Sequence, residues 1–220
     1  MSPDPPSPEG APSVPAVKIV LLAAFALLTL VLVGSMLFFV VGSGRPPLPV
    51  LSSVPDFELV DRDGRAVTLA DLEGRPWIAD FIFTRCRTVC PRMTWQLAKL
   101  KPSLPEDVGV VSFSVDPKYD TPEVLAEYAE RHGADAGWYF LTGDLETIDA
   151  LTSEAFLLPL DRSPDPEVMA TPDPILHSNR FVLVDGEARI RGYYDAFDPK
   201  EVERLLGDVK GLLAGSRPRT

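Results

Sequence analysis

Short apolar runs alternate with amphipathic stretches between residues 77 and 156, and this pattern predicts strands that alternate with helices. Trp77–Phe83 is apolar and aromatic except for Asp80, which is typical of a buried central strand. Pro91 fits the first turn of the helix that follows, and Pro102 ends that helix. The same alternation predicts further strands over residues 108–115 and 138–143, and further helices over residues 122–132 and 145–156.

Two hairpins are predicted on either side of this alternation. Residues 56–72 alternate around Asp63-Gly64, a strong turn signal, and residues 180–194 do the same around Asp185-Gly186. A last helix is expected after Pro199. The proline-rich residues 157–177 show neither the helical nor the strand periodicity of apolar positions, and they are expected to form a long loop. The combination predicts an α/β domain with a mixed sheet covered by helices.

One apolar segment stands apart from this pattern. Ile19–Val41 has no charged residue and is long enough to span a bilayer, while its leader is not basic, so an uncleaved anchor is predicted rather than a signal peptide. Lys18 and Arg45 nearly cancel in the positive-inside comparison and leave the orientation open. The predicted organisation is a disordered proline-rich N-terminus (1–17), a transmembrane anchor (18–42), a proline-rich tether (43–54), a folded domain (55–214) and a tail (215–220).

The overall charge limits which classes of molecule the folded domain can bind. A net charge of −11 argues against nucleic acid and against an anionic membrane surface as a partner of the folded domain. The sequence contains no phosphate-binding loop, dinucleotide fingerprint or Ser/His/Asp pattern. Its two cysteines are too few for a multi-bridge secreted scaffold and are interpreted as one site.

These cysteines, Cys86 and Cys90, fall on the turn between the first buried strand and the next helix. Residues four apart lie on one face of a helical turn, near enough to share a metal ion or to form a disulfide. The positive end of the helix dipole and the flanking Arg85 and Arg87 favour thiolates. The alternative is an ordinary core or disulfide pair, although structural disulfides usually close longer loops.

The two histidines differ in position. His132 falls at the end of a predicted helix, where a surface or dipole-compensating role explains it. His177 ends the proline-rich loop before a strand, at the rim of the sheet, where it is either a structural histidine or a ligand. Two thiolates and one imidazole would suit Cu(I) and could hold Cu(II), whereas structural zinc normally takes four protein ligands. Met93 could add a thioether, but its spacing fits a core position.

A group of acidic residues is expected beside the cysteines. Asp116 and Asp120 follow the end of the 108–115 strand, and ligand sites in open α/β sheets lie at that edge. Asp116 could orient a ligand or partner, or it could shape the turn with Pro117. Either Asp120 or Thr121 can cap the next helix.

Three motifs resemble the Sco/SenC family in order and distance: FTRCRTVCP (83–91), SVDPKYDTP (114–122) and LHSNRFVLVDGEARI (176–190). The resemblance covers nearly all of residues 55–213 and implies a thioredoxin-like fold on the extracytoplasmic side of the cell membrane. It also implies copper binding through Cys86, Cys90 and His177. Family members often carry CPDVCP; here Arg87 and Thr88 replace Pro and Asp, as in the similar CETICP version of some bacterial members.

Two functions follow from the resemblance. The first is a copper metallochaperone that helps to assemble the Cu(A) centre of cytochrome c oxidase subunit II, or serves another copper-receiving oxidase. The second is a membrane-anchored thiol-disulfide oxidoreductase or redox sensor, with Cys86 and Cys90 as the redox-active pair, acting on the Cu(A) cysteines. Thioredoxin-type enzymes favour two residues between the cysteines and this chain has three, which weighs against the second function. Other thioredoxin-like or copper-carrier proteins are further partners that the resemblance implies.

Overall fold

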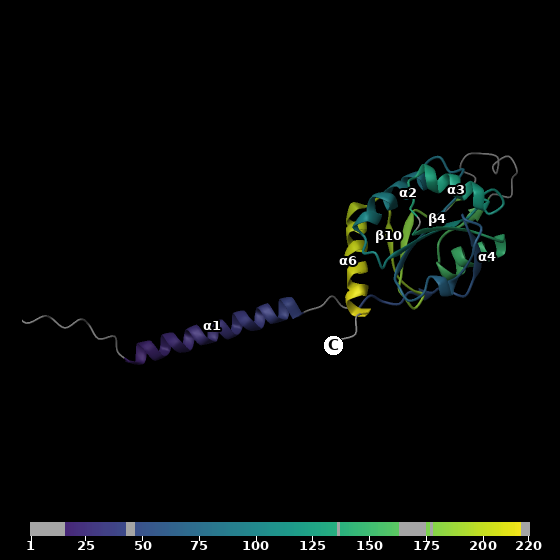
Figure 1. The fold of residues 1–220 in the computed structure, drawn as a ribbon. Coiled ribbons are helices and arrows are strands. Elements are labelled where there is room, and N and C mark those ends of the chain that lie inside the picture. Colours follow the sequence, from purple (N-terminus) through teal and green to yellow (C-terminus); the bar gives the residue numbers. More distant parts are fainter. Residues whose placement is uncertain (1–15, 43–46, 136, 163–174, 177, 217–220) are drawn as a thin grey trace, which may run out of the picture. The chain divides into compact units, whose positions relative to one another are not determined.

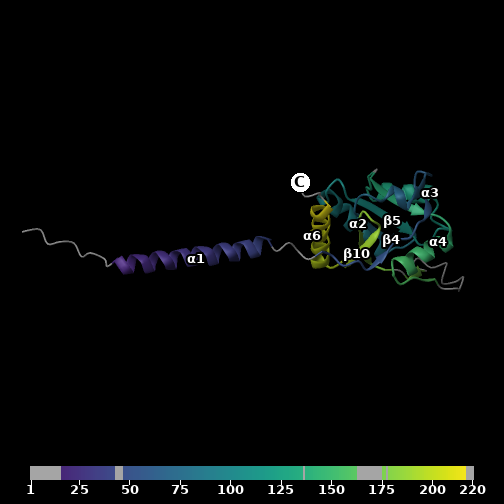
Figure 2. The ribbon, with the colours of Figure 1, turned by 90° about the horizontal axis from the view of Figure 1, so that it is seen from below.

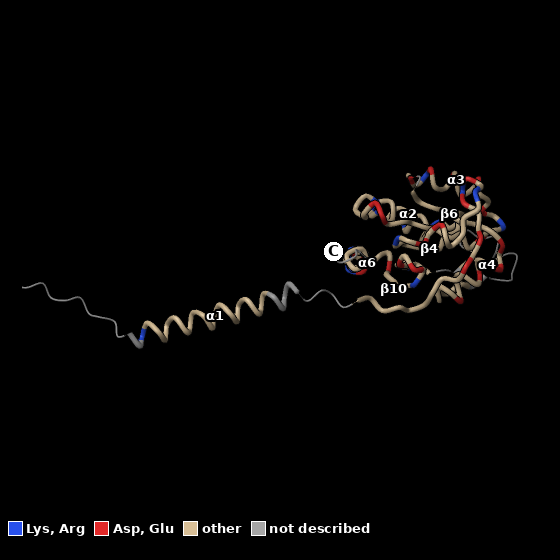
Figure 3. The backbone as a smooth tube through the Cα atoms, turned by 60° about the horizontal axis from the view of Figure 1, so that its bottom comes forward, with Lys and Arg blue, Asp and Glu red and all other residues tan. Residues whose placement is uncertain are grey.

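The structure is a computed structural model that describes residues 16–42, 47–135, 137–162, 175–176 and 178–216. It divides into two compact units, Met1–Pro46 and Pro47–Thr220 (Figure 1). The described part of the first unit is one helix, α1 (Ala16–Gly42). Lys18–Leu37 of this helix is apolar enough and long enough to cross a membrane, and no other charged side chain follows Lys18 in that span (Figure 3).

The second unit is built on a mixed sheet of eight strands among the described residues. Their order is β1-β10-β9-β4-β5-β6-β2-β3. The bounds are β1 Ser52–Ser53, β2 Glu58–Asp61, β3 Ala66–Thr68, β4 Trp77–Ile82, β5 Gly109–Ser114, β6 Trp138–Thr142, β9 Arg180–Val184 and β10 Arg189–Asp195. Two short strands, β7 (Asp161–Arg162) and β8 (Ile175–Leu176), pair with each other outside this sheet.

The middle of the sheet carries both strand directions. β4, β5 and β6 run parallel, while β9 runs antiparallel to β4 and pairs with β10 as a hairpin. The hairpin β2–β3 forms around Gly64, whose φ of +75° suits glycine. The predicted mixed sheet and both hairpins are therefore confirmed.

Helices cover the sheet (Figures 1 and 2). They are α2 (Val89–Leu100), α3 (Pro122–Arg131), α4 (Leu145–Ala150) and α6 (Pro199–Ser216), with 3-10 turns at Leu69–Asp71 and Lys101–Ser103 and a π-helical turn at Leu151–Ala155. Thr121 rather than Asp120 caps α3, because its side chain accepts a hydrogen bond from the N–H of Val124.

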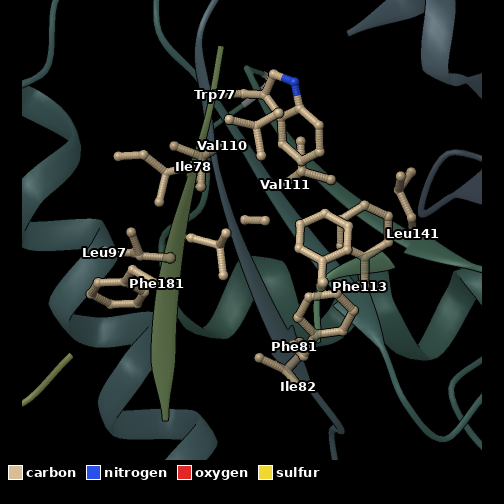
Figure 4. Close-up of a cluster of buried hydrophobic side chains, with 14 of the residues drawn as sticks. Trp77, Ile78, Phe81, Ile82, Leu97, Val110, Val111, Phe113, Leu141 and Phe181 are labelled. Carbon is tan, nitrogen blue, oxygen red and sulfur yellow. The ribbon is translucent and has the colours of Figure 1, made fainter. Parts of the chain in front are cut away.

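The core lies on both faces of the central strands. Leu97 of α2 lies with Ile78 on one side, whereas Phe81 and Phe113 lie on the other (Figure 4). Phe156, which follows the π-helical turn, packs against both of these rings at centroid distances of 4.9 and 5.7 Å. The strands are thus buried from both sides, and this explains their nearly continuous apolar sequence.

Residues that the sequence assigns to the tether are bonded to the sheet. The N–H groups of Leu51 and Val54 donate to the carbonyl groups of Ile190 and Ala188. The guanidinium of Arg191 donates to the carbonyl groups of Leu48 and Pro49. This segment is therefore held along β10, an arrangement that its proline-rich composition does not indicate.

Candidate metal centre

Cys86 and Cys90 lie where β4 ends and α2 begins. Cys90 is fully buried in the first turn of α2, and Cys86 in the preceding turn is 5% exposed. Both are present as thiols. The Cys90 sulfur accepts a hydrogen bond from the N–H of Phe83, and the Cys86 sulfur accepts one from the N–H of Cys90, each at 3.4 Å. The backbone therefore directs polar hydrogens at both sulfurs.

The expectation that this position favours a thiolate is wrong for Cys90. Burial raises the pKa of the Cys90 thiol well above its ordinary value, and the neighbouring Cys86 raises it further. The N–H of Phe83 lowers this pKa, but by less. Arg85 does not reverse the effect, since its guanidinium is bonded to Asp116. Burial is the largest cause of this shift, so binding of a metal ion to the Cys90 sulfur has to displace the thiol proton.

The loop after β5 holds the residues that precede Cys86, as expected from its place at the sheet edge. The Asp120 carboxylate accepts hydrogen bonds from the N–H of Thr84 at 3.1 Å, from the Thr84 hydroxyl and from the Ser114 hydroxyl at 2.6 Å. Asp116 pairs with Arg85 at 2.5 Å. The predicted proximity of both acidic residues to the cysteine turn is confirmed.

The third predicted ligand, His177, lies outside the described residues. The described residues that follow it in the chain have a defined place. Since β9 is antiparallel to β4 in the register Ala79↔Val182, the beginning of β9 lies at the edge where β4 ends. Ser178, the residue after His177, is described and buried. Within the part of the chain that the structure describes, no three His, Cys, Asp or Glu side chains gather as a metal site.

The other two candidate side chains have structural positions. His132 follows the last turn of α3 and its ring lies 4.4 Å from that of Tyr128; burial and the nearby Arg131 lower its pKa. His132 therefore lies beside a helix end, as expected, and its lowered pKa disfavours the charged form that would compensate the dipole. Met93 is fully buried in the core, as its spacing predicts.

Comparison with known proteins decides the family. Residues 49–214 match the family model for SCO1/SenC. The chain belongs to the SCO1/SenC family.

Solved structures of the same fold support this assignment. A SCO1/SenC family lipoprotein from Bacillus anthracis str. Ames is 33% identical with a TM-score of 0.68, and the match covers 77% of this chain and 98% of that one. BsSco, in which a disulfide switch was identified and which is a member of the Sco family of cytochrome c oxidase assembly proteins, is 32% identical with a TM-score of 0.63, over 76% and 97%. Arabidopsis thaliana ScoI with copper bound is 26% identical with a TM-score of 0.60, over 74% and 99%. The thioredoxin-like fold expected from the sequence is confirmed.

This SCO1/SenC chain also has buried hydrogen bonds around the cysteine helix and the central strands that the sequence analysis did not predict. Thr94 donates a hydrogen bond to the carbonyl of Cys90 at 3.0 Å, and its hydroxyl lies 2.8 Å from that of Tyr128 on α3. In β4, the buried Asp80 accepts a hydrogen bond from Ser112, which in turn accepts one from the Trp138 indole at 2.9 Å. A polar residue one helical turn after Cys90, and a single acid in an apolar strand, are the signals that could have indicated them.

A pocket of about 810 Å³ opens beside the cysteine helix. Its wall includes Val89, which precedes Cys90, and Ser178, which follows His177. Tyr193 and Phe197 add aromatic surface to it. Leu157, at the rim, has a φ of +51°, which is uncommon for a residue with a branched side chain. In the SCO1/SenC chain the residue before Cys90 and the residue after His177 therefore line the same pocket.

Proposed function

We propose that this protein is a copper metallochaperone that carries copper through Cys86, Cys90 and His177. The observation that carries the proposal is the placement of two buried thiols, one in the first turn of α2 and one in the turn just before it, at the sheet edge where β9 begins. His177 lies three residues before the first residue of β9, which is within reach of this edge. The copper-bound state of the Arabidopsis relative supports copper as the cargo.

The donor set suits copper in its reduced form. Thiolate and imidazole ligands are soft, and Cu(I) accepts a low coordination number, so a fourth protein ligand is not required. Burial excludes water from Cys90 and raises the pKa of its thiol, so copper capture there involves loss of a proton. The same three ligands can hold Cu(II).

The partner in this proposal is a copper-receiving oxidase, with the Cu(A) centre of cytochrome c oxidase subunit II as the specific recipient. Membership of the SCO1/SenC family and the description of BsSco as an oxidase assembly protein support it. In the proposal α1 is a single-pass anchor in the cell membrane, with the second unit on the extracytoplasmic side.

Copper titration of the full-length protein in detergent micelles tests the ligand set. Cys86→Ala, Cys90→Ala and His177→Ala should each weaken Cu(I) binding at least about a hundredfold, because each removes one of three ligands. His132→Ala is the matched histidine control and should bind copper as the unchanged protein does. A ligand variant with unchanged affinity would remove that residue from the site.

Thiol-disulfide exchange on the Cu(A) cysteines is the second candidate, including a role as a redox sensor. The hydrogen bond from the Cys90 N–H to the Cys86 sulfur, which places the two cysteines side by side, and the disulfide switch of BsSco favour it. The two functions differ at His177, since thiol exchange does not use an imidazole ligand. Cells that carry His177→Ala and assemble active oxidase normally would favour exchange, whereas loss of assembly in that variant would favour copper delivery.

A further inference from the structure

The turn that carries Cys86 is tied to a different strand of the sheet. Residues 84 and 85 follow β4, whereas their partners come from β5 and the loop behind it. Asp120, fully buried, accepts hydrogen bonds from both the backbone N–H and the hydroxyl of Thr84. Ser114, at the end of β5, donates to the same carboxylate at 2.6 Å.

A second set of contacts holds Arg85, the residue after Thr84. The Arg85 guanidinium donates to one oxygen of Asp116 through Nε at 3.1 Å and through Nη2 at 2.5 Å. On its other side it lies 4.7 Å from the centre of the Tyr119 ring. Both residues before Cys86 are thus fixed by the 116–120 loop, which we name the clasp loop.

The two cysteines differ in how they can move. Cys90 lies in the first turn of α2, is fully buried, and its carbonyl is bonded by Thr94. Cys86 belongs to the turn before the helix, and its own N–H donates to the carbonyl of Phe83. A disulfide requires the two sulfurs to approach to about 2.05 Å. Cys86 lies outside α2, so helical hydrogen bonds restrict its turn less than they restrict Cys90, and the clasp loop supplies the restraint on that turn.

We propose that Asp120 is a positioning residue that, through Thr84, holds the Cys86 turn in the dithiol arrangement and so disfavours closure of the Cys86–Cys90 disulfide. The inference rests on the proposed function in one respect, namely that these two cysteines are the working thiols. It extends the site by an acidic residue that acts through Thr84 and is not one of the proposed ligands. Arg85 and Asp116 act in the same direction through the neighbouring residue.

Redox equilibration of the full-length protein in detergent micelles tests this inference. The protein is incubated with mixtures of glutathione and glutathione disulfide, and its thiols are counted by alkylation. In each oxidation two protein thiols lose two protons and two electrons and form one S–S bond. One molecule of glutathione disulfide accepts the two protons and the two electrons, and its S–S bond breaks to give two glutathione thiols.

Asp120→Ala removes the acceptor of all three hydrogen bonds, and it should shift the equilibrium toward the protein disulfide at least about tenfold, which is about 30 mV for a two-electron couple. Thr84→Val removes only the hydroxyl contact and should shift it by about threefold in the same direction. Thr84→Val also decides the question if Asp120→Ala does not fold.

Asp61→Ala is the matched control. Asp61 is also buried, burial raises its pKa as it raises that of Asp120, and it accepts a backbone N–H at 2.9 Å from Phe140. It lies on β2, three strands from β4, so its loss should lower stability but change the disulfide equilibrium less than about twofold.

Two results would overturn the inference: a shift below twofold in both clasp variants, or an equal shift in Asp61→Ala. Copper titration of the unchanged protein separates this outcome from failure of the proposed function. A protein that binds no copper but shows the expected redox shifts would contradict the chaperone and leave the positioning role of Asp120 intact.

Discussion

Replacing Asp185 by asparagine should loosen the β9–β10 turn and the segment that precedes the domain. One carboxylate oxygen of Asp185 accepts the backbone N–H of Arg189 at 3.0 Å. The other accepts Nε of Arg189 at 2.9 Å and Nη1 of Arg191 at 2.5 Å. Arg191 also holds the carbonyl groups of Leu48 and Pro49, so one carboxylate orients the cation that holds this segment.

The size of the effect follows from the exposure of the two arginines. The Arg189 side chain is 37% exposed, and an ion pair of that kind contributes at most about 1 kcal/mol. Arg191 is 9% exposed, and breaking a buried pair costs about 3–5 kcal/mol when nothing else compensates. Its two remaining carbonyl acceptors reduce that cost, so we expect Asp185→Asn to lower the free energy of unfolding by about 3 kcal/mol.

The contribution of Asp185 to stability depends on pH, and the sign of this dependence follows from the pKa of its carboxyl group. Burial raises the pKa of Asp185, but hydrogen bonds from the Arg189 N–H and from both guanidinium groups outweigh it, and the pKa lies below its ordinary value of 3.8. A carboxyl group with a lowered pKa adds stability above its unfolded-state pKa, and this stability is lost as the pH falls through the folded-state value. The difference in stability between the unchanged protein and Asp185→Asn should therefore be full at neutral pH and shrink below pH 3.8.

Urea unfolding followed by tryptophan fluorescence, at neutral and acid pH, measures this difference in the full-length protein. Hydrogen exchange at Leu51 and Val54, whose amides pair with β10, should accelerate in the variant. Glu187→Gln is the control, because it removes only an exposed ion pair to Arg189 and should cost less than about 1 kcal/mol. An Asp185→Asn protein no less stable than Glu187→Gln, with unchanged exchange, would refute the reasoning.

Two further predictions concern packing. Phe113→Ala should cost about 3–5 kcal/mol in urea unfolding, because Phe113 is fully buried and its ring stacks on Phe81 at 5.1 Å; a loss below about 1 kcal/mol would contradict the description of this core. Gly192→Ala should also destabilise, by about 1–3 kcal/mol, since its Cβ would lie 2.5 Å from the Tyr194 hydroxyl oxygen. Gly211→Ala in α6 is the contrasting change, because the added Cβ meets no atom within 4 Å. It should stabilise the protein by about 1 kcal/mol. Equal effects of Gly192→Ala and Gly211→Ala would contradict this description of the packing.

The elements of the fold were predictable where local pattern determines them. Trp77–Ile82 is the buried strand that its apolar run predicts, and Gly64 and Gly133 take the positive φ values that a turn and a helix end require. Trp95 shows the limit of this reasoning. It is apolar yet 57% exposed, because it is two residues from both Met93 and Leu97 and so lies on the opposite side of α2, where apolar character alone does not lead to burial.

Long-range contacts account for most of what the sequence did not reveal. Leu51 pairs with Ile190 although the two are far apart in the chain, and no local signal marks that partnership. For Cys90, the helix dipole and the flanking arginines are visible in the sequence, whereas the depth of burial that opposes ionisation is a property of the folded sheet. The placement of Asp116 and Asp120 was predictable because both follow a strand that ends at the same edge.

The antiparallel alignment of β9 with β4 has a consequence for how long the protein persists in the cell before it is degraded. In an unfolded chain His177 and the two cysteines are separated by a long stretch of polymer, whereas in the folded chain β9, which begins three residues after His177, starts at the edge where β4 ends. A cargo ion that uses all three groups is captured by the native state in preference to the denatured ensemble, and so adds RT ln(1 + [L]/Kd) to native-state stability. Loaded molecules should then resist proteolysis longer than empty ones, so that copper supply itself would set how much of the carrier persists.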